Sequence, residues 1–328
     1  MSEADLKRRI LAEVQGELAA IEQAIEANLA PHVELAREIA GHLLFAGGKR
    51  LRPLLMVLCS RLCGYRGGYE TTFSTIFEYI HAATLLHDDV IDGGRLRRGR
   101  PAAHRIWDPP AVVLTGDFLL ARALSIAARA GRLRILEVVA NVTEEMTQGE
   151  ILQLQRKGDL DLTRDEYLRI IRCKTAVLFE GACRVSALLA DAPAGAEEAL
   201  GRYGHHLGLA FQMADDLLDY TEDSAALGKL PGADLREGKL TLPVIHALAR
   251  ASEADRRTMV GIIEQPDFSA ETFAGLVSLL HRYDGIDHTR RQAAMEVSRA
   301  KASLDFFPAS KIRSILMDIA DYALIRKS

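Results

Sequence analysis

The amino-acid sequence predicts an all-α protein, a single-domain bundle of ten or more helices over residues 1–328. Apolar residues recur every three or four positions through most of the chain, as at Leu6, Ile10 and Val14, which places them on one helix face. No stretch alternates between apolar and polar residues as a half-buried strand does. No low-complexity segment or charge block divides the chain, so one domain is expected even at this length.

Prolines and glycines indicate where the helices begin and end. The first helix ends at Pro31, a second covers about 33–45, and Pro53 fits the first turn of a third, where a missing N–H is tolerated. Glycine pairs such as 93–94 are typical of helix ends. Further helices are expected at 70–92, 111–130, 133–156, 164–190, 195–220, 241–250, 255–264, 270–283 and 288–325, the last broken at Pro308. The loops expected to carry polar function are 66–69, 93–110 and 221–240.

The composition excludes several classes of protein. A net charge of -4 argues against a generally basic nucleic-acid binder. The four cysteines lack metal-ligand spacing and are expected to be reduced core thiols. The N-terminus carries acids instead of a signal peptide's apolar core, and the longest apolar run, at 54–59, is far below the ~18–20 residues of a membrane span. We therefore expect a cytoplasmic protein without a transmembrane segment.

Three aspartates are crowded into the end of an apolar helix. Asp88, Asp89 and Asp92 follow the run IHAATLL, and their spacing puts Asp88 and Asp92 on one helix face. Carboxylates so close together repel one another unless cations lie between them. A solvated acidic patch is the simplest alternative, but the apolar run before the aspartates indicates a largely buried helix.

The same spacing occurs a second time. Asp215, Asp216 and Asp219 end another mostly apolar helical stretch, HHLGLAFQMA. Oxygen ligands without a histidine or cysteine partner favour Mg²⁺ over zinc or iron, and Mg²⁺ shares its ligand sphere with phosphate oxygens. Two such clusters therefore predict a site that holds a diphosphate through metal ions.

Basic residues accompany both acidic clusters. GGKRLRP at 47–53 and RLRRGR at 95–100 are framed by glycine and proline, which places them at helix ends where backbone N–H groups also bind anions. Arginine suits two-pronged contacts with phosphate oxygens, although a solvated basic face is the ordinary alternative for any single one. Further cations follow at Lys174, Lys229 and Lys239.

In chain order, GGKRLRP, HDDVID with RRG, KTA, FQMADDLLD and GKLPGADLREGKLTLP resemble the motifs of the trans-isoprenyl diphosphate synthases, the polyprenyl synthetase family. The likeness covers about residues 30–250 and is to long-chain, octaprenyl-type members. It implies a helical bundle around a deep central cavity, a homodimer, and about three Mg²⁺ ions in each active site.

The resemblance also implies a reaction. An allylic diphosphate, farnesyl or geranyl diphosphate, loses its diphosphate at the acidic motifs, and isopentenyl diphosphate attacks the allylic cation. A proton then leaves, to the released diphosphate, giving a trans double bond. Repeated additions give a medium-to-long-chain polyprenyl diphosphate, as used for quinone side chains. Release of this apolar product through transient membrane contact is compatible with the sequence.

Carried over by position, the resemblance assigns roles to individual residues. The metal ligands are Asp88, Asp89, Asp92, Asp215, Asp216 and Asp219, the last partly through water. The catalytic residues are Asp88, Asp89, Asp92, Lys174, Asp215 and Asp216. Isopentenyl diphosphate would contact Lys49, Arg50, Arg52, His81 and Arg98. The allylic diphosphate would contact Arg97, Lys174, Thr175, Gln212, Lys229 and Lys239.

Product length is expected to depend on the helix that carries the first aspartates. Ala83 and Thr84, about one turn before Asp88, are small and leave room for a growing chain, whereas aromatic residues there stop elongation in short-chain members. A medium-to-long product, octaprenyl-type with heptaprenyl to decaprenyl in range, is therefore favoured over geranylgeranyl or farnesyl diphosphate.

Three rival interpretations fit the sequence less well. His81, His87 and Asp88 could suggest a helical metal phosphohydrolase, but the second aspartate cluster would then have no function. A terpene cyclase would normally keep one full aspartate cluster. A non-catalytic subunit of a heteromeric synthase usually has degraded motifs, and both clusters are intact here.

Overall fold

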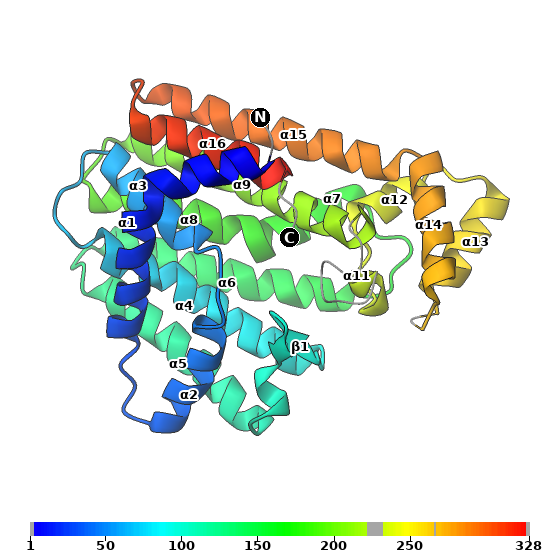
Figure 1. Cartoon of the computed structure of the whole chain (residues 1–328), viewed down its shortest axis with the longest axis horizontal. Coiled ribbons are helices and arrows are strands. Elements are labelled where there is room, and N and C mark those ends of the chain that lie inside the picture. The colour runs from blue at the N-terminus through cyan, green and yellow to red at the C-terminus, as the bar shows by residue number, and fades with distance from the viewer. Residues whose placement is uncertain (1–2, 222–231, 266, 326–328) are drawn as a thin grey trace.

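The computed structural model describes residues 3–221, 232–265 and 267–325, and it confirms the all-α bundle (Figure 1). The helices are α1 (Glu3–Leu29), α2 (Glu34–Leu44), α3 (Leu51–Leu62), α4 (Glu70–Ile91), α5 (Pro109–Ala128), α6 (Leu133–Gln155), α7 (Arg164–Ile171), α8 (Val177–Leu189), α9 (Ala194–Thr221), α11 (Ala233–Arg236), α12 (Leu242–Leu248), α13 (Glu253–Ile263), α14 (Ala270–Arg282), α15 (Gly285–Ser303) and α16 (Lys311–Ile325). A π-helix at Arg172–Ala176 and 3₁₀ turns at Ala103–Arg105 and Leu304–Phe306 complete the helical structure of these residues.

The apolar side chains form two neighbouring clusters. The larger one gathers α1 to α6, α8 and α16, and the smaller one gathers α7 and α11 to α14. Helices α9 and α15 contribute to both clusters and pack closely on each other, so they connect the two halves of the bundle. In Figure 1, α15 runs along one edge of the bundle, and α13 and α14 lie at one end.

A short β-hairpin departs from the expectation of no strands. β1 (Leu96–Arg97) pairs antiparallel with β2 (Arg100–Pro101). The two turn residues, Arg98 and Gly99, both have positive φ, 52° and 74°, which is the requirement for a tight hairpin turn. Strands of two residues are too short to show an alternation of apolar and polar side chains, so the sequence predicted only a basic loop here.

The most apolar helix, α5, is long enough to cross a membrane by length and composition, and it is the one such helix within the described ranges. Core helices of globular proteins pass the same test, and α5 packs against α2, α4 and α6. It is therefore a helix of the bundle. Its first turns nevertheless leave Val113 and Leu114 exposed, at 36% and 66%.

Candidate active site

Both aspartate clusters lie at the C-terminal ends of long helices. Asp88 and Asp89 occupy the last turn of α4, and Asp92 is its C-cap. Asp215, Asp216 and Asp219 lie in the last two turns of α9. The C-terminus is the negative end of a helix dipole, so carboxylates there are doubly unfavourable unless cations offset them. The local charge therefore favours binding of cations.

Each aspartate of the first cluster has its own basic partner. Lys174 Nζ lies 3.4 Å from Asp88, and Arg97 Nε donates to Asp89 at 3.0 Å. Burial raises the pKa of Asp88, and the nearby Lys174 only partly opposes this effect. Asp89 is almost fully buried, at 3% exposure, so its Arg97 partner replaces lost hydration.

Two ammonium groups meet at Asp92. Lys239 Nζ lies 3.0 Å from one carboxylate oxygen and Lys157 Nζ lies 3.3 Å from the other. Burial acts to raise the pKa of Asp92, but the two lysines outweigh it and the pKa is lowered. The loops carrying these lysines are joined by a hydrogen bond from the Gly158 N–H to the Gly238 carbonyl, 2.8 Å long. Asp92 is thus ionised and charge-compensated without a metal.

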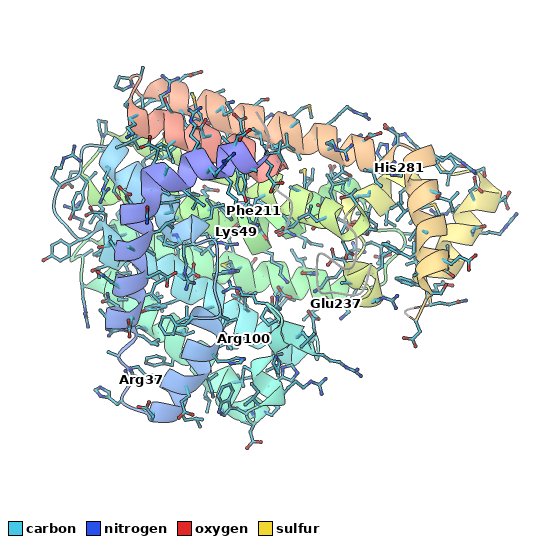
Figure 2. The ribbon with its side chains drawn as sticks, viewed as in Figure 1. Arg37, Lys49, Arg100, Phe211, Glu237 and His281 are labelled. Carbon is cyan, nitrogen blue, oxygen red and sulfur yellow. The ribbon has the colours of Figure 1, made fainter. Side chains whose placement is uncertain are left out.

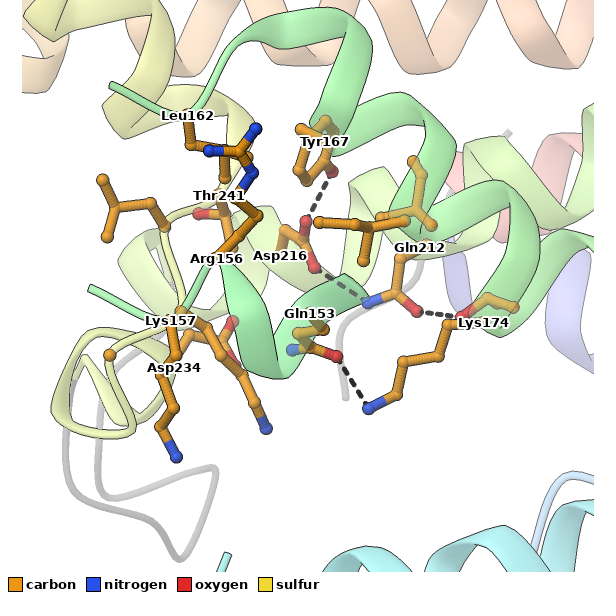
Figure 3. A pocket seen from close by; sticks show the side chains of 16 residues that line it. Gln153, Arg156, Lys157, Leu162, Tyr167, Lys174, Gln212, Asp216, Asp234 and Thr241 are labelled. Carbon is orange, nitrogen blue, oxygen red and sulfur yellow. Dashed lines mark hydrogen bonds between the residues drawn. The ribbon is translucent and has the colours of Figure 1, made fainter. Parts of the chain in front are cut away.

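The second cluster is held by neutral donors instead (Figure 3). Tyr167 donates its hydroxyl to one oxygen of Asp216 at 2.5 Å, and the Gln212 amide donates to the other at 2.8 Å. Thr175 in turn donates to Gln212 at 2.7 Å. Burial raises the pKa of Asp216 to about 7, against the effect of both hydrogen bonds and aided by the neighbouring Asp215 and Asp219. Among the residues that the structure describes, Asp216 therefore has hydrogen-bond donors but no paired cation.

Asp219 anchors the next loop rather than pointing freely at a ligand. Its two oxygens accept the backbone N–H groups of Ala233 and Asp234, at 2.9 and 3.1 Å. These groups open α11, so the carboxylate caps that short helix. This geometry agrees with an indirect contact to a metal through water. Asp215 is half-buried on the same helix, and Lys229 lies outside the described residues.

Lys174 and Thr175 lie in the π-helix between α7 and α8, which interrupts the single helix expected over 164–190. Such insertions re-aim side chains and are frequent at functional sites. A Cβ at Gly149 of α6 would lie 2.9 Å from the backbone nitrogen of Lys174. A Cβ at Gly208 of α9 would lie 2.5 Å from Ala176 Cα. Glycine at both positions lets two helices approach the π-helix closely.

The partners of both clusters line one cavity of about 140 Å³ (Figure 3). Lys174, Lys239 and Lys157 come from the first cluster's partners, and Tyr167 and Gln212 come from the second's. The structure thus brings together residues that are far apart in the sequence. Their amides, hydroxyl and ammonium groups suit an anion bound beside cations.

Several residues of this site had no signal in the sequence. Tyr167, Lys157 and Asp234 line the cavity, and Glu150 and Gln153 of α6 contact Lys174 Nζ at 2.6 and 2.8 Å. None belongs to a motif quoted above except Asp234, within GADLREGK. Gln153 and Lys157 follow Glu150 at i+3 and i+7, a spacing that could only have suggested a shared helix face.

The first basic cluster surrounds a different group of side chains. Arg52 stacks over the Phe179 ring, 4.7 Å from its centroid, and Arg98 donates to the Gly47 carbonyl, which ties the hairpin to this loop. Lys49 and Phe211 line a second, mostly apolar cavity of about 370 Å³ (Figure 2). Lys49 and Arg52 therefore lie at the N-terminal end of α3, and Arg98 is tied to the loop that precedes it.

Arg50 departs from its expected role. Its side chain is 3% exposed and pairs with Glu22 at 2.6 Å and with Glu78 at 2.5 Å. Burial acts to lower the pKa of Arg50, but the two glutamates outweigh it and the pKa is raised. The guanidinium is thus paired inside the protein, where its two ion pairs hold the loop before α3. Spacing alone could not separate it from its neighbours.

His81 lies on α4, one to two turns before Asp88. Burial and the positive charges of Arg52 and Arg98 lower its pKa well below the ordinary value. The imidazole is therefore neutral at pH 7 and offers a single N–H to an anion.

Ala83 and Thr84 differ in their surroundings although they are adjacent. Ala83 is fully buried, at 0% exposure, whereas Thr84 is half-buried and bonds the His81 carbonyl at 2.9 Å. Thr84 lies four residues before Asp88 and shares its helix face, and Ala83 is rotated away from it. Of the two, Thr84 is better placed beside the metal-binding end of α4.

Comparison with known proteins decides the family. The sequence model of the polyprenyl synthetases matches residues 33–280. The chain belongs to the polyprenyl synthetase family. It is 37% identical to octaprenyl diphosphate synthase of Escherichia coli strain K12 over 94% of this chain and 96% of that protein. It is 38% identical to an all-trans-nonaprenyl-diphosphate synthase, geranyl-diphosphate specific, of Rhodobacter capsulatus over 98% of both chains.

The family fold is equally clear in three dimensions. A polyprenyl synthase from Caulobacter crescentus, crystallised with calcium and isoprenyl diphosphate, superimposes with a TM-score of 0.92 at 40% identity, covering 98% of both chains. The long-chain resemblance found in the sequence and the helical synthase fold are therefore both confirmed.

Proposed function

We propose that this polyprenyl synthetase is a metal-dependent trans-prenyltransferase. It condenses isopentenyl diphosphate with an allylic diphosphate, farnesyl or geranyl diphosphate, in repeated steps. The observation that carries this proposal is the pair of aspartate clusters at two helix C-termini, whose partners line a single cavity. The octaprenyl and nonaprenyl synthases among its relatives, and a neighbour that holds calcium and isoprenyl diphosphate, support the same reaction.

The carboxylates fit hard divalent ions, which we propose to be Mg²⁺, about three per site. Asp88, Asp89, Asp92, Asp215 and Asp216 would hold the ions, and Asp219 would act partly through water. When bound, the ions neutralise the charge that develops on the departing diphosphate. The remaining work falls to the protein's own side chains.

Three lysines are poised to move from carboxylate to phosphate. Lys174, Lys239 and Lys157 now compensate Asp88 and Asp92. If Asp88 and Asp92 bind metal ions, the lysines would be released from these two carboxylates and could contact the allylic diphosphate, while Lys174 and Lys239 keep Glu150 and Glu237, each at 2.6 Å. Arg97, Thr175 and Gln212 would orient that diphosphate, so Lys157 joins the residues named by the family motifs. Charge placed where the leaving group forms is the largest source of catalysis in such a site.

Isopentenyl diphosphate, the second substrate, would bind near the N-terminal end of α3. Lys49, Arg52 and Arg98 supply positive charge there, and neutral His81 supplies an N–H. Arg50 supports the loop through its buried ion pairs instead of touching the diphosphate. No protein base is required, because the released diphosphate accepts the proton.

The product is proposed to be a medium-to-long-chain polyprenyl diphosphate, octaprenyl-type, for quinone side chains. Thr84 leaves the turn before Asp88 on that helix face without an aromatic barrier, and Ala83 beside it is small as well. The chain would act as one domain, since α9 and α15 run through both apolar clusters. A homodimer in the cytoplasm is proposed as well, with Leu114 and its exposed apolar neighbours on α5 as the interface.

The test is elongation by the purified protein with farnesyl diphosphate, isopentenyl diphosphate and Mg²⁺, followed by chain-length analysis of the products. Repeated additions are expected, with none in the presence of a chelator. Asp88→Ala should abolish turnover while the circular dichroism spectrum stays helical. Glu145→Ala, an acidic change on α6 outside the cavity lining, is the matched control and should elongate normally. Absence of elongation by the wild type would refute the proposal.

A further inference from the structure

Two histidines and an aspartate gather where α12 meets α15, away from both aspartate clusters. His246 lies in α12, and His288 lies in the first turn of α15. Asp284 is the N-cap of α15, with a left-handed φ of 60° that turns the chain into the helix. Asp284 and His288 are four residues apart and so share a helix face. One ligand atom from each residue lies within 4.8 Å of those of the other two.

Two buried nitrogen atoms at this junction are not satisfied. Nε2 of His246 and Nε2 of His288 are both enclosed, and neither has a hydrogen-bond partner among the residues that the structure describes. His246 as a whole is only 7% exposed. Buried polar atoms without a partner are rare in folded proteins, and a bound water or ion is one explanation for them.

The imidazoles are neutral, which is the form that binds metals. Burial, the neighbouring His288 and the nearby Arg250 lower the pKa of His246 to about 4. Burial and the charges of Arg164, Arg250 and Arg291 lower the pKa of His288 as well. At pH 7 both rings therefore carry a lone pair, and no proton has to be removed from an imidazolium before binding.

We propose that His246, His288 and Asp284 form a binding site for a transition-metal ion of the Zn²⁺ type, separate from the catalytic Mg²⁺ ions. Two imidazole nitrogens and one carboxylate are a ligand set that suits Zn²⁺ or Co²⁺, whereas Mg²⁺ prefers oxygen alone. Three protein ligands leave a fourth position for water. The ion would brace α12, which follows the loop of Lys239, against α15.

Binding requires rearrangement of Arg250, which is exposed, and of one imidazole ring. Arg250 Nη1 lies 3.1 Å from His246 Nδ1 and can only donate, so Nδ1 accepts and Nε2 carries the proton. For Nε2 to bind an ion, Arg250 has to withdraw into solvent and the proton has to move to Nδ1. The two rings are stacked, with centroids 3.7 Å apart, so one ring must also turn to aim at a shared ion.

Asp284 can bind a metal ion at the loss of one exposed ion pair. Arg291 is its ion-pair partner, but the two side chains are 59% and 49% exposed. An ion pair so exposed is weakened by solvent screening, so a metal ion on Asp284 can replace Arg291. The competition from Arg250 and Arg291 sets the affinity of the site, and removal of Arg250 should therefore strengthen binding.

Co²⁺ is the probe that separates this site from the catalytic one. The full-length protein, without a histidine tag and stripped with a chelator, is titrated with Co²⁺ and followed by visible absorption. Four-coordinate Co²⁺ with histidine ligands absorbs strongly, and Co²⁺ held by carboxylates and water absorbs weakly. Strong bands that saturate at one equivalent are expected, and added Zn²⁺ should remove them.

Matched variants locate the signal. His288→Gln should abolish the bands, whereas His32→Gln, at an exposed histidine elsewhere, and Asp88→Asn in the catalytic cluster should leave them unchanged. Arg250→Ala should tighten Co²⁺ binding, because it removes the group that competes for His246 Nδ1. Wild-type protein without strong bands, or bands that persist in a folded His288→Gln variant, would overturn the proposal.

Discussion

Replacement of Thr84 by phenylalanine should shorten the product. Thr84 lies four residues before Asp88, hence about 6 Å along the α4 axis and about 40° around it. A growing prenyl chain directed away from the diphosphates along this face meets position 84 within that distance. Thr84 is half-buried, so an aromatic ring has partly open space to enter, whereas Ala83 is completely enclosed. Elongation should therefore stop early and leave a product shorter than that of the wild type.

The assay compares product lengths and initial rates for the wild type, Thr84→Phe and Thr84→Ser. Thr84→Ser keeps a small hydroxyl side chain and should give the wild-type length. Ala83→Phe should also shorten the product, but it overfills a closed position and should cost about 1–3 kcal/mol in the free energy of unfolding. Unchanged product length in a folded, active Thr84→Phe enzyme would refute the assignment of this face to the growing chain.

Three other predictions concern charge and surface. The pKa of Asp216 is raised to about 7 in the folded state, so folding takes up a proton between about pH 4 and pH 7. Without Mg²⁺, the enzyme should therefore lose stability relative to Asp216→Asn as the pH rises through this range. Measurement of Tm for both proteins at several pH values checks the sign. Arg50→Ala should lower the free energy of unfolding by about 3–5 kcal/mol, measured in urea, because it strands Glu78 at 5% exposure; a loss no larger than that of a surface arginine contradicts the buried ion pair. Leu114→Glu should shift the molar mass in light scattering from dimer to monomer, and an unaltered mass would place the interface elsewhere.

The partners of Asp92 and Asp216 affect the order in which Mg²⁺ and the allylic diphosphate bind. Asp92 is paired with Lys239 and Lys157, whereas Asp216 has neutral donors alone within the described ranges, and its pKa is raised. A metal ion arriving alone must displace two lysines at the first cluster or a proton at the second. A metal–diphosphate complex brings new partners for the lysines at the same time. We therefore expect Mg²⁺ to bind more tightly in the presence of an allylic diphosphate.

The sequence by itself determined the fold class, the family and the two aspartate clusters. These features depend on local spacing: apolar residues every three or four positions give helices, and aspartates at i, i+1 and i+4 share a helix end whatever the rest of the chain does. The break at Pro308 and the helix end near Pro31 were predictable for the same reason, since proline acts on its own turn.

Only the tertiary structure decided what surrounds those local patterns. Within one basic motif it buries Arg50 between two glutamates, although its neighbour Arg52 carries the same charge. It brings Lys157 to Asp92, and it joins His246 to His288 across two helices. Such contacts depend on which helix faces meet, and charge and periodicity in one segment carry no information about the partner that packing will supply.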